Sequence, residues 1–428
     1  MNKRVWQPII VIWVLTTYIL LFYLIFQDKF KLDFSTFYSS VLAIMHDENP
    51  YKALVADYLP IPRTLSNNLC PPFFLILTYP FGLLGYHAAL FLWCLFSFIS
   101  GLIGAGLAFS FAFSKDSLRK HGLGLLLLYM MLFSTIMNLA VGQMGAVLFF
   151  FIMSGYYYYL QERDYLAGIL WAIIISIKFF PGLLFFFVLS ERRFKLLFIM
   201  LFVFLCCWII PLFFYGPQIY LHYYTLMNNI SWYADSWNAS IYGFLFRLFT
   251  FSYHVPYELR MTIRLIYVPV FAITLALYYH FLRTGTNNHA TNHYRFSLTL
   301  VFMLLLSPLG WIYYFSLLIL PLALSWSKEV QKNNAPSLAL GLWLLCLFLL
   351  NFPFDYVRIG HIPHIFTRAT IYSFHFYGLL ILAYLIIKEK ELPGQNELIA
   401  TPLLSSLVFI LILSSAVPLA SFIVALIR

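Results

Sequence analysis

Charged side chains are scarce in this chain. Asp, Glu, Lys and Arg make up 10% of its 428 residues, whereas hydrophobic residues make up 62%. A soluble domain carries about 25% charged residues and about 45–50% apolar ones. So few charges could not cover the apolar surface of a water-soluble fold of this length, which excludes that class. The composition instead suits a chain whose solvent is the lipid bilayer.

Cysteine is also rare, and its placement excludes several kinds of site. The five cysteines are scattered, mostly inside apolar runs, and no metal-site spacing relates them. The sequence therefore predicts packing thiols, and we expect no metal ion and no cofactor. The cysteines are Cys70, Cys94, Cys206, Cys207 and Cys346.

The net charge of +10 raises the possibility of a nucleic-acid partner. The basic residues, however, lie in short joints between apolar runs. Basic residues in such joints indicate that the joints lie in water at the inner face of the membrane, where anionic lipids attract them. We therefore expect membrane lipids, and no nucleic acid, among the partners.

Long apolar runs are what the chain has in quantity. They predict an all-α, polytopic transmembrane bundle of roughly 11–13 spans, with residues 1–428 as one integral membrane domain. The first run, 6–26, lacks a small-residue cleavage site and reads as a retained helix. Run 71–113 fits a short helix followed by a full one, and the short runs 165–177, 180–190 and 296–306 suggest broken or re-entrant helices. The other runs are 123–141, 144–160, 196–215, 265–282, 311–327, 336–352, 373–387 and 401–427.

The distribution of Lys and Arg predicts the orientation of the chain. With the N-terminus inside, the inner joints hold 15 of the 26 Lys and Arg residues. The long loops 27–70, 216–264 and 353–372 then all lie outside, and their many aromatic residues indicate order rather than disorder. We therefore expect function at the non-cytoplasmic face. The inner joints are 1–5, 114–122, 161–164, 191–195, 283–295, 328–335 and 388–400.

The first outer loop carries the main candidate for acid–base chemistry. Asp33 follows the first span after a short polar step, and residues 34–45 fit an amphipathic helix in the membrane interface. A carboxylate there could take a proton from an acceptor hydroxyl. As an equal alternative, Asp33 only caps the helix. Asp47, Glu48 and Asp57 are rival bases in the same loop.

Two further clusters interrupt apolar runs. Gly142-Gln143 joins two apolar helices, where a tight hairpin turn is a plainer interpretation than a ligand site. Lys178 lies inside an apolar run, where a charge is costly unless it reaches the interface or faces a cavity and a partner. Facing inward, its ammonium would neutralise a departing lipid phosphate. Snorkelling to the interface is the alternative.

The second outer loop carries a fourth cluster. Asn238-Ala239-Ser240 is followed by Arg247. A guanidinium group can bind a phosphate through two parallel hydrogen bonds, so Arg247 is a candidate phosphate ligand. A plain interfacial arginine is the alternative.

A fifth cluster, residues 307–314, marks a broken helix. It contains Ser307-Pro308 and then Trp311, Tyr313 and Tyr314. These aromatic residues could stack on a sugar or belong to the aromatic belt of a membrane interface. By the predicted orientation all five clusters lie outside, which random placement would produce about one time in sixteen. This convergence favours one shared site.

The order of these motifs resembles that of a known family. They span about residues 30–320 and are similar to the GT-C glycosyltransferases, specifically the bacterial polyprenol-phosphate-mannose-dependent α-mannosyltransferases. The matching pieces are Asp33, Tyr38, Asn49-Pro50-Tyr51, Pro71-Pro72-Phe73, Gly142-Gln143, Lys178-Phe179-Phe180-Pro181, Asn238-Ala239-Ser240, Arg247, Ser307-Pro308 and Trp311.

The resemblance implies a GT-C fold, a polyprenyl-phosphate-sugar donor and an essential Asp at the position of Asp33. Lys178 and Arg247 would bind the donor phosphate. The family usually carries His shortly after the Ser-Pro…Trp motif, whereas this chain has tyrosines, which indicates a different acceptor or sugar, or a non-catalytic member. Substrate-binding residues would be Tyr38, Tyr51, Gln143, Asn238, Ser240, Trp311, Tyr313 and Tyr314.

The predicted function is transfer of a hexose, mannose-like or related, from a polyprenyl-phosphate-sugar donor to a lipid-linked or cell-envelope glycan acceptor. The expected location is a bacterial cell membrane, with the active site on the non-cytoplasmic side. The alternatives are a transporter or flippase of a lipid-linked sugar, and a non-catalytic assembly protein. A transporter predicts inverted repeats with paired broken helices, and no such pairing is visible.

The predicted orientation leads to a labelling experiment. Cysteine reporters at Ser39 and Ser236 should react with an impermeant reagent from outside, whereas one at Ser117 should react only after permeabilisation. Labelling of the first outer loop only from the cytoplasm would contradict both the orientation and the shared-site argument.

Overall fold

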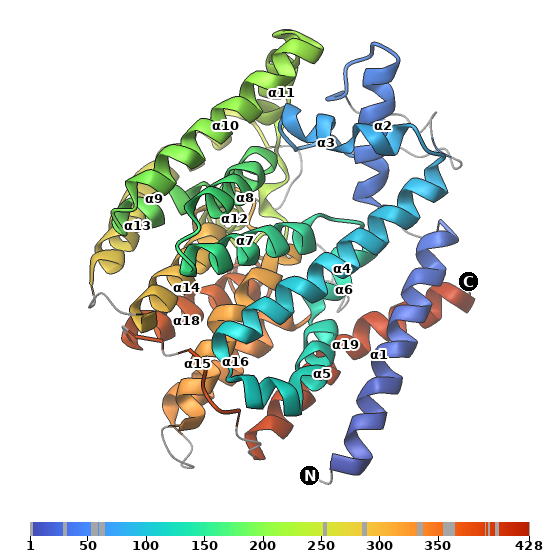
Figure 1. Cartoon of the computed structure of the whole chain (residues 1–428). Coiled ribbons are helices and arrows are strands. Elements are labelled where there is room, and N and C mark those ends of the chain that lie inside the picture. The colour runs from blue at the N-terminus through green and yellow to red at the C-terminus, as the bar shows by residue number, and fades with distance from the viewer. Residues whose placement is uncertain are drawn as a thin grey trace. The chain divides into compact units, whose positions relative to one another are not determined.

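A computed structural model gives the fold of the chain (Figure 1). It describes residues 3–28, 32–52, 59, 65–250, 255–284, 289–331, 337–353, 364–389, 391–392, 394–398 and 402–427. In these residues the fold is helical, with no strand apart from two isolated β-bridges. The all-α prediction is confirmed.

The helices begin and end close to the apolar runs of the sequence. In chain order they are α1 Lys3–Phe26, α2 Asp33–Met45, α3 Pro72–Gly82, α4 Tyr86–Ala112, α5 Lys115–Met131, α6 Phe133–Ala140, α7 Gly145–Leu160, α8 Asp164–Ile177, η1 Phe180–Gly182, α9 Leu183–Ser190, α10 Phe194–Tyr215, α11 Gln218–Asn229, η2 Trp232–Ala234, α12 Ile241–Phe249, α13 Tyr257–Arg283, α14 His289–Leu306, η3 Ile312–Leu318, α15 Ile319–Gln331, α16 Leu338–Asn351, α17 Ile365–Ala369, η5 Ile371–Ser373, α18 Phe374–Glu389 and α19 Pro402–Ile427.

Six of the described helical segments are long and apolar enough to cross a membrane, and a seventh is possible if α5 and α6, bent by 61°, form one broken span. The polytopic prediction is thus confirmed, with six or seven long segments rather than 11–13. Several predicted spans are helices of 10–17 residues, shorter than the about 20 that one crossing needs. The six are Pro8–Phe26, Tyr86–Ala112, Phe194–Tyr215, Tyr257–Arg283, Ile365–Glu389 and Leu404–Ile427.

Two apolar runs correspond to helices whose bounds differ from those of the run. Run 71–113 divides into α3 and α4, as expected from its length. The span predicted at 265–282 begins earlier, at Tyr257, so Arg260 and Arg264 lie inside α13.

The chain folds into two compact units, each built from separate stretches of sequence. Unit 1 comprises residues 1–20, 102–136 and 231–428, and unit 2 comprises 21–101 and 137–230. Unit 2 contains α2, α3 and α7 to α11, whereas unit 1 contains α5 and α12 to α19.

In unit 2, close helix packing depends on small residues. The indole of Trp171 on α8 donates to the Ile152 carbonyl on α7 at 3.1 Å. A Cβ at Gly155 would stand 2.3 Å from Trp171 Nε1, so only glycine lets the two helices approach this far. α8 also packs along α10, where Gly168 faces Ile199.

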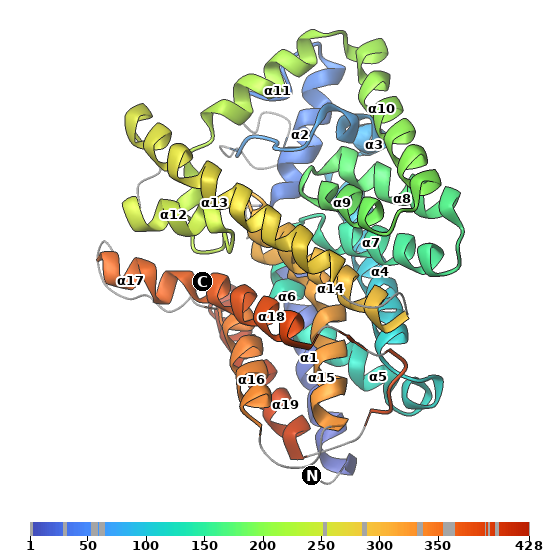
Figure 2. The ribbon, with the colours of Figure 1, turned by 90° about the vertical axis from the view of Figure 1, so that its left-hand side faces the viewer.

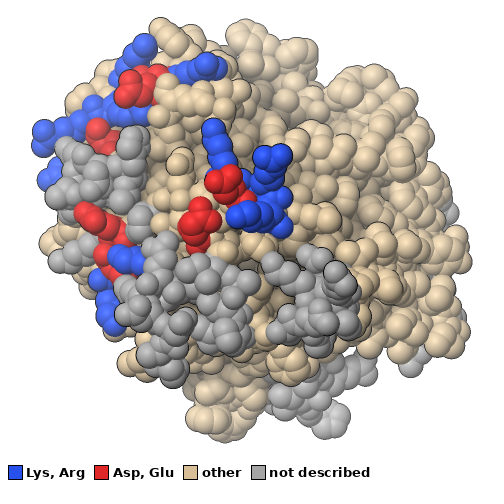
Figure 3. All heavy atoms as spheres, turned by 60° about the horizontal axis from the view of Figure 1, so that its bottom comes forward, with Lys and Arg blue, Asp and Glu red and all other residues tan. Residues whose placement is uncertain are grey.

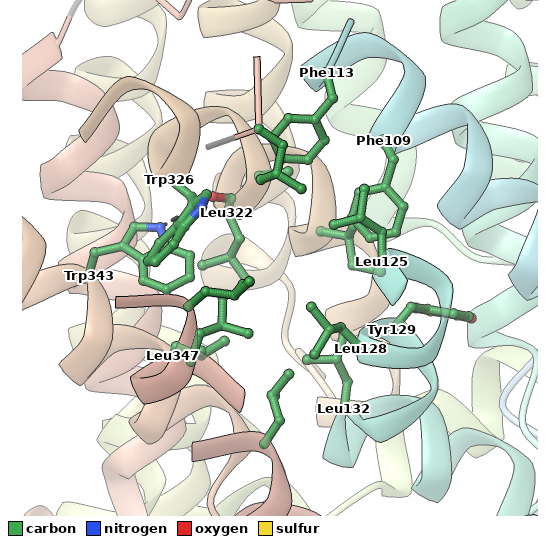
Figure 4. Close-up of a pocket in the computed structure, with 16 residues that line it drawn as sticks. Phe109, Phe113, Leu125, Leu128, Tyr129, Leu132, Leu322, Trp326, Trp343 and Leu347 are labelled. Atoms are coloured by element: carbon green, nitrogen blue, oxygen red, sulfur yellow. Dashed lines mark hydrogen bonds between the residues drawn. The ribbon is translucent and has the colours of Figure 1, made fainter. Parts of the chain in front are cut away.

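In unit 1, α14, α16 and α18 pack side by side, and α19 joins α5 and α16. Trp13 on α1 donates to the Ser415 hydroxyl on α19 at 2.9 Å. A pocket of about 80 Å³ opens between α5, α15, α16 and α19 (Figure 4). Its lining is almost entirely apolar, with Trp326, Trp343 and Leu347 on one side, and the hydroxyl of Tyr129 points away from the pocket.

Charged residues lie in small groups of both signs on the face in Figure 3. Glu397 accepts hydrogen bonds from Ser114 and Ser117, each at 2.7 Å, which joins the segment after α18 to the start of α5. Because Ser39, Ser117 and Ser236 are all buried, reporters for the labelling experiment belong at exposed positions such as Glu48 outside and Asp116 inside. Of the predicted packing thiols, Cys206 is half-buried and the other four are buried, and all five are unpaired.

Candidate functional site

The start of α2 is attached to the turn between α6 and α7. The backbone N–H of Asp33 donates to the Val141 carbonyl at 2.7 Å. Gln143 Nε2 donates to Asp33 Oδ2 at 2.6 Å. The half-buried carboxylate of Asp33 is thus held in place by a buried amide from 110 residues further along the chain.

Gly142 makes this attachment possible. Its φ of +66° is a conformation that L side chains rarely adopt, and a Cβ there would stand 2.9 Å from Phe34 Cβ. Trp93 Nε1 donates to the Gly142 carbonyl at 2.9 Å and its ring packs against Phe34. The hairpin-turn interpretation of Gly142-Gln143 is confirmed, and the same turn also supplies the amide that orients Asp33.

Asp33 is not the N-cap of α2, contrary to the capping alternative. The cap position is Leu32, which has no side-chain cap hydrogen bond, and Asp33 is the first residue of α2. The predicted helix at 34–45 is present, but it is buried on most of its faces rather than amphipathic, since Ser35, Ser39 and Ser40 are buried as well. Packing against α3 explains this burial.

Lys178 lies at a helix break. α8 ends at Ile177, Lys178 is extended (φ −144°, ψ 130°), and η1 begins at Phe180. Burial raises the pKa of the Cys70 thiol, whereas Lys178 lowers it by charge and by a hydrogen bond, and the charge of Asp33 raises it. Asp33 and Lys178 therefore both act on one buried side chain within unit 2.

Asn68 belongs to the same group, and the sequence analysis missed it. Its Oδ1 accepts the Cys70 backbone N–H at 3.0 Å. The side chain is 1% exposed, and its Nδ2 has no hydrogen-bond partner among the described residues. The signal was an amide pair, Asn67-Asn68, placed directly before Leu69-Cys70-Pro71-Pro72.

The two tyrosines predicted to bind substrate in this unit make structural contacts. Tyr51 donates to the Cys70 carbonyl at 3.0 Å, and its ring packs on Tyr223. Tyr38 donates to the Leu84 carbonyl at 2.8 Å. Both are buried, so they shape the walls around the Asp33 and Lys178 group.

The rival carboxylates are not placed with this group by any described contact. Asp47 and Glu48 are exposed in the turn after α2. Asp57 lies outside the described residues.

In unit 1, Asn238 joins two segments that are distant in sequence. Its Nδ2 donates to the Tyr233 carbonyl at 3.0 Å and to the Pro308 carbonyl at 2.9 Å. Its Oδ1 accepts the Gly310 N–H at 2.9 Å. Ser240 caps α12 by accepting the Gly243 N–H at 2.9 Å. The fourth and fifth predicted clusters are thus brought together.

Arg247, the predicted phosphate ligand, is fully buried beneath this junction. Its Nη1 donates to the carbonyls of Asp235 and Asn238, both at 2.8 Å, and its Nε donates to the Ser373 hydroxyl at 2.9 Å. Because three of its donor bonds are made within the protein, Arg247 holds the 235–238 turn against η5.

The aromatic residues of the fifth cluster stack on one another. The rings of Trp311 and Tyr313 lie 5.9 Å apart at 26°, and Trp237 meets Tyr313 edge-on. Trp237 is a further member that the sequence analysis missed, although it directly precedes Asn238. Tyr313 and Tyr314 are buried, whereas Trp237 and Trp311 are half-buried.

The predicted site residues thus form two groups, one in each unit. Asp33, Gln143 and Lys178 belong to unit 2, and the Asn238 junction with its aromatic residues belongs to unit 1. That both groups form one shared site stays a prediction.

These features define a class: a multi-pass helical membrane protein that holds ionisable side chains at helix starts and breaks. A family model, glycosyltransferase family 87, matches residues 68–308, more than half of the chain. The chain belongs to this family and is therefore a membrane glycosyltransferase. The matched stretch contains Gln143, Lys178 and Asn238, whereas Asp33 precedes it. Neither the curated proteins nor the solved structures include a significant match.

Asp235 leads to a pH-dependent prediction. Burial raises the pKa of its carboxyl above the usual 3.8, although the Trp237 N–H and Arg247 act in the opposite direction. A raised pKa adds stability below the unfolded pKa, and this stability is lost as pH rises through the folded pKa. Asp235→Asn can still accept the Trp237 N–H but cannot ionise. Its melting temperature should therefore rise relative to that of the wild type as the pH is raised from 4 to 7.

Thermal unfolding of the purified protein in detergent measures this difference. Asp47→Asn, at an exposed turn position, is the matched control and should show no such trend. A difference between Asp235→Asn and wild type that is constant with pH would contradict the prediction.

Proposed function

We propose that this glycosyltransferase moves a hexose, mannose or a related sugar, from a polyprenyl-phosphate-sugar donor to a lipid-linked or cell-envelope glycan at the non-cytoplasmic face. The observation that carries the proposal is the Asp33 carboxylate of a family 87 membrane protein. Gln143 fixes this carboxylate, whose charge acts on the same buried thiol, Cys70, as that of Lys178. Family membership also favours transfer over the transporter alternative.

Asp33 is the general base of the proposed reaction. The acceptor hydroxyl oxygen attacks the anomeric carbon of the sugar, and its proton passes to the Asp33 carboxylate. The bond between that carbon and the phosphate oxygen breaks, and its electron pair leaves with the polyprenyl phosphate. Gln143 fixes one carboxylate oxygen, which supports the orientation that proton transfer needs.

Lys178 supplies the positive charge for the leaving group. As the glycosidic bond breaks, negative charge develops on the phosphate oxygen, and a fixed cation stabilises that charge. The break between α8 and η1 puts Lys178 outside regular helix, where its half-buried side chain can turn toward a ligand instead of lipid. The sugar passes through an oxocarbenium-like transition state by analogy with glycoside chemistry.

The aromatic residues of unit 1 are proposed to bind sugar rings. Trp237 and Trp311 offer half-buried ring faces, and apolar faces of sugars pack on such rings. Tyr313 and Tyr314 occupy the positions after the Ser-Pro…Trp motif, so any proton transfer there would involve a phenol rather than an imidazole. Asn238, Ser240 and Arg247 hold this platform in shape.

The base assignment predicts the behaviour of Asp33→Asn. The amide keeps the size of the side chain but cannot accept a proton, so transfer should fall by at least about 10²-fold at normal abundance. Radiolabelled polyprenyl-phosphate-mannose, with glycan acceptor in purified membranes, measures the rate. Asp47→Asn serves as the control at an exposed carboxylate. Near-normal turnover in Asp33→Asn would remove Asp33 from the chemistry.

The leaving-group assignment predicts the behaviour of Lys178→Met. Methionine keeps an apolar stem and removes the charge, so donor use should weaken by about tenfold or more, the value of a hydrogen bond to a charged group. Lys52→Met, at an exposed lysine of the same unit, should leave donor use unchanged. Poor folding combined with normal donor affinity in the surviving protein would identify Lys178 as an interfacial anchor.

A further inference from the structure

Two arginines of unit 1 have no part in the chemistry above. Arg260 and Arg264 lie in the first half of α13, a helix long and apolar enough to cross a membrane. Residues four apart share one face of a helix. An ionisable residue in such a helix is costly and by default marks a functional position.

The arginines of α13 act on two tyrosines. α13 packs against α12 (Figure 2), and α12 in turn packs against η2. Burial raises the pKa of the Tyr242 hydroxyl, and Arg264 opposes this through a hydrogen bond and its charge. The charges of Arg260 and Arg264 also act on Tyr233, whose ring lies 4.7 Å from that of Tyr242. Both arginines are therefore close enough to one tyrosine pair to act on it electrostatically.

This pair of positive charges has no counter-charge within the described part of the chain. No carboxylate lies within 4.0 Å of Arg260 or Arg264, and Arg260 Nε is buried without an acceptor. Two other half-buried cations differ, since Arg193 pairs with Asp164 and Lys328 with Glu389. A buried donor without an acceptor costs about 1–3 kcal/mol, and more if charged.

The position in the helix adds to this cost. Arg260 lies in the first turn and a half of α13, where the helix dipole disfavours cations and favours anions. The cap residue is Pro256, which makes no side-chain cap hydrogen bond. Glu258 is the one acid of the first turn, but it is exposed and two residues from Arg260, which places it on another face. An anion beside Arg260 and Arg264 would therefore be stabilised by both the arginines and the helix.

We propose that Arg260, Arg264 and the Tyr242 hydroxyl bind the phosphate of a lipid headgroup. The guanidinium fork matches phosphate geometry, and two forks on adjacent turns can hold two sides of one phosphate. The end of a membrane-crossing helix lies at the depth of the headgroups. Beyond the arginines, Leu265 and Val268 are exposed by 70% and 63%, so the same helix offers an apolar path for the lipid chain.

A snorkelling arginine would look different. Its guanidinium would extend into water beyond the membrane and remain hydrated. Arg260 and Arg264 are instead half-buried on a helix that packs against α12, and Arg260 Nε is fully buried. At the other end of the helix, Arg283 is exposed and donates to the Tyr279 hydroxyl at 2.7 Å. It has the features of a solvated arginine and makes a matched control.

The test is lipid binding by the purified full chain in detergent, measured by native mass spectrometry. The probes are polyprenyl phosphate, phosphatidylglycerol and the phosphate-free polyprenol. Wild type and Arg283→Gln should retain one phosphate lipid tightly and the alcohol weakly. The double variant Arg260→Gln/Arg264→Gln should bind the phosphate lipid at least about tenfold more weakly. Arg260→Lys/Arg264→Lys keeps the charges without the forks and should give an intermediate loss.

The two phosphate lipids distinguish the source of the headgroup. Retention of polyprenyl phosphate that phosphatidylglycerol does not displace identifies the donor or its leaving group, a reading that rests on the proposed function. Retention of phosphatidylglycerol identifies a bilayer lipid, and this outcome stands even if no sugar transfer is found. Equal binding of the phosphate lipids by wild type and both double variants overturns the proposal. If the glutamine variant elutes as aggregate, the lysine variant and the single Arg264→Gln change decide in the same way.

Discussion

A polar group that leaves water in this chain costs free energy unless it finds a partner, and the arrangement of both units follows from that constraint. With 10% charged residues, few partners exist. Buried amides therefore serve as junctions: Gln143 joins the turn after α6 to the start of α2, and Asn238 joins the segment before α12 to the one after α14. Each amide offers two donors and an acceptor, so one side chain can satisfy backbone groups from several segments. Where such junctions form, irregular backbone can persist beside apolar helices.

The same constraint separates the basic residues by role. Arg247 donates hydrogen bonds to two backbone carbonyls and to a serine hydroxyl, and these bonds fix a turn. Arg193 and Lys328 are paired with carboxylates. Three other cations act on uncharged groups instead, so they can also bind a ligand. Lys178 acts on a thiol, and Arg260 and Arg264 act on tyrosine hydroxyls. What a cation contacts, rather than its presence in an apolar run, indicates its function.

The helices could be predicted from the sequence because apolar runs and their breaks are local signals. Run 71–113 was long enough to show that it holds two helices, and the charge of Lys178 marked the break after α8. The contacts could not be predicted in the same way. The bond from Gln143 to Asp33 connects residues 110 apart, and nothing in either local sequence specifies the other. Asn68 was missed because a single buried amide has no pattern, and the contacts of Arg247 could not be predicted because two of its acceptors are backbone carbonyls, which any sequence provides.

The bond between Trp13 and Ser415 has a consequence for biosynthesis. The two residues are 402 positions apart, so α1 enters the membrane long before its partner on α19 exists. At about 5–20 residues per second, that interval is on the order of tens of seconds. Unit 2 ends at Ile230 and can complete its packing within that time, whereas unit 1 needs segments from both ends of the chain. Until α19 arrives, the indole N–H of Trp13 lacks this acceptor, so α1 stays in the membrane without its final partner for most of the synthesis of the chain.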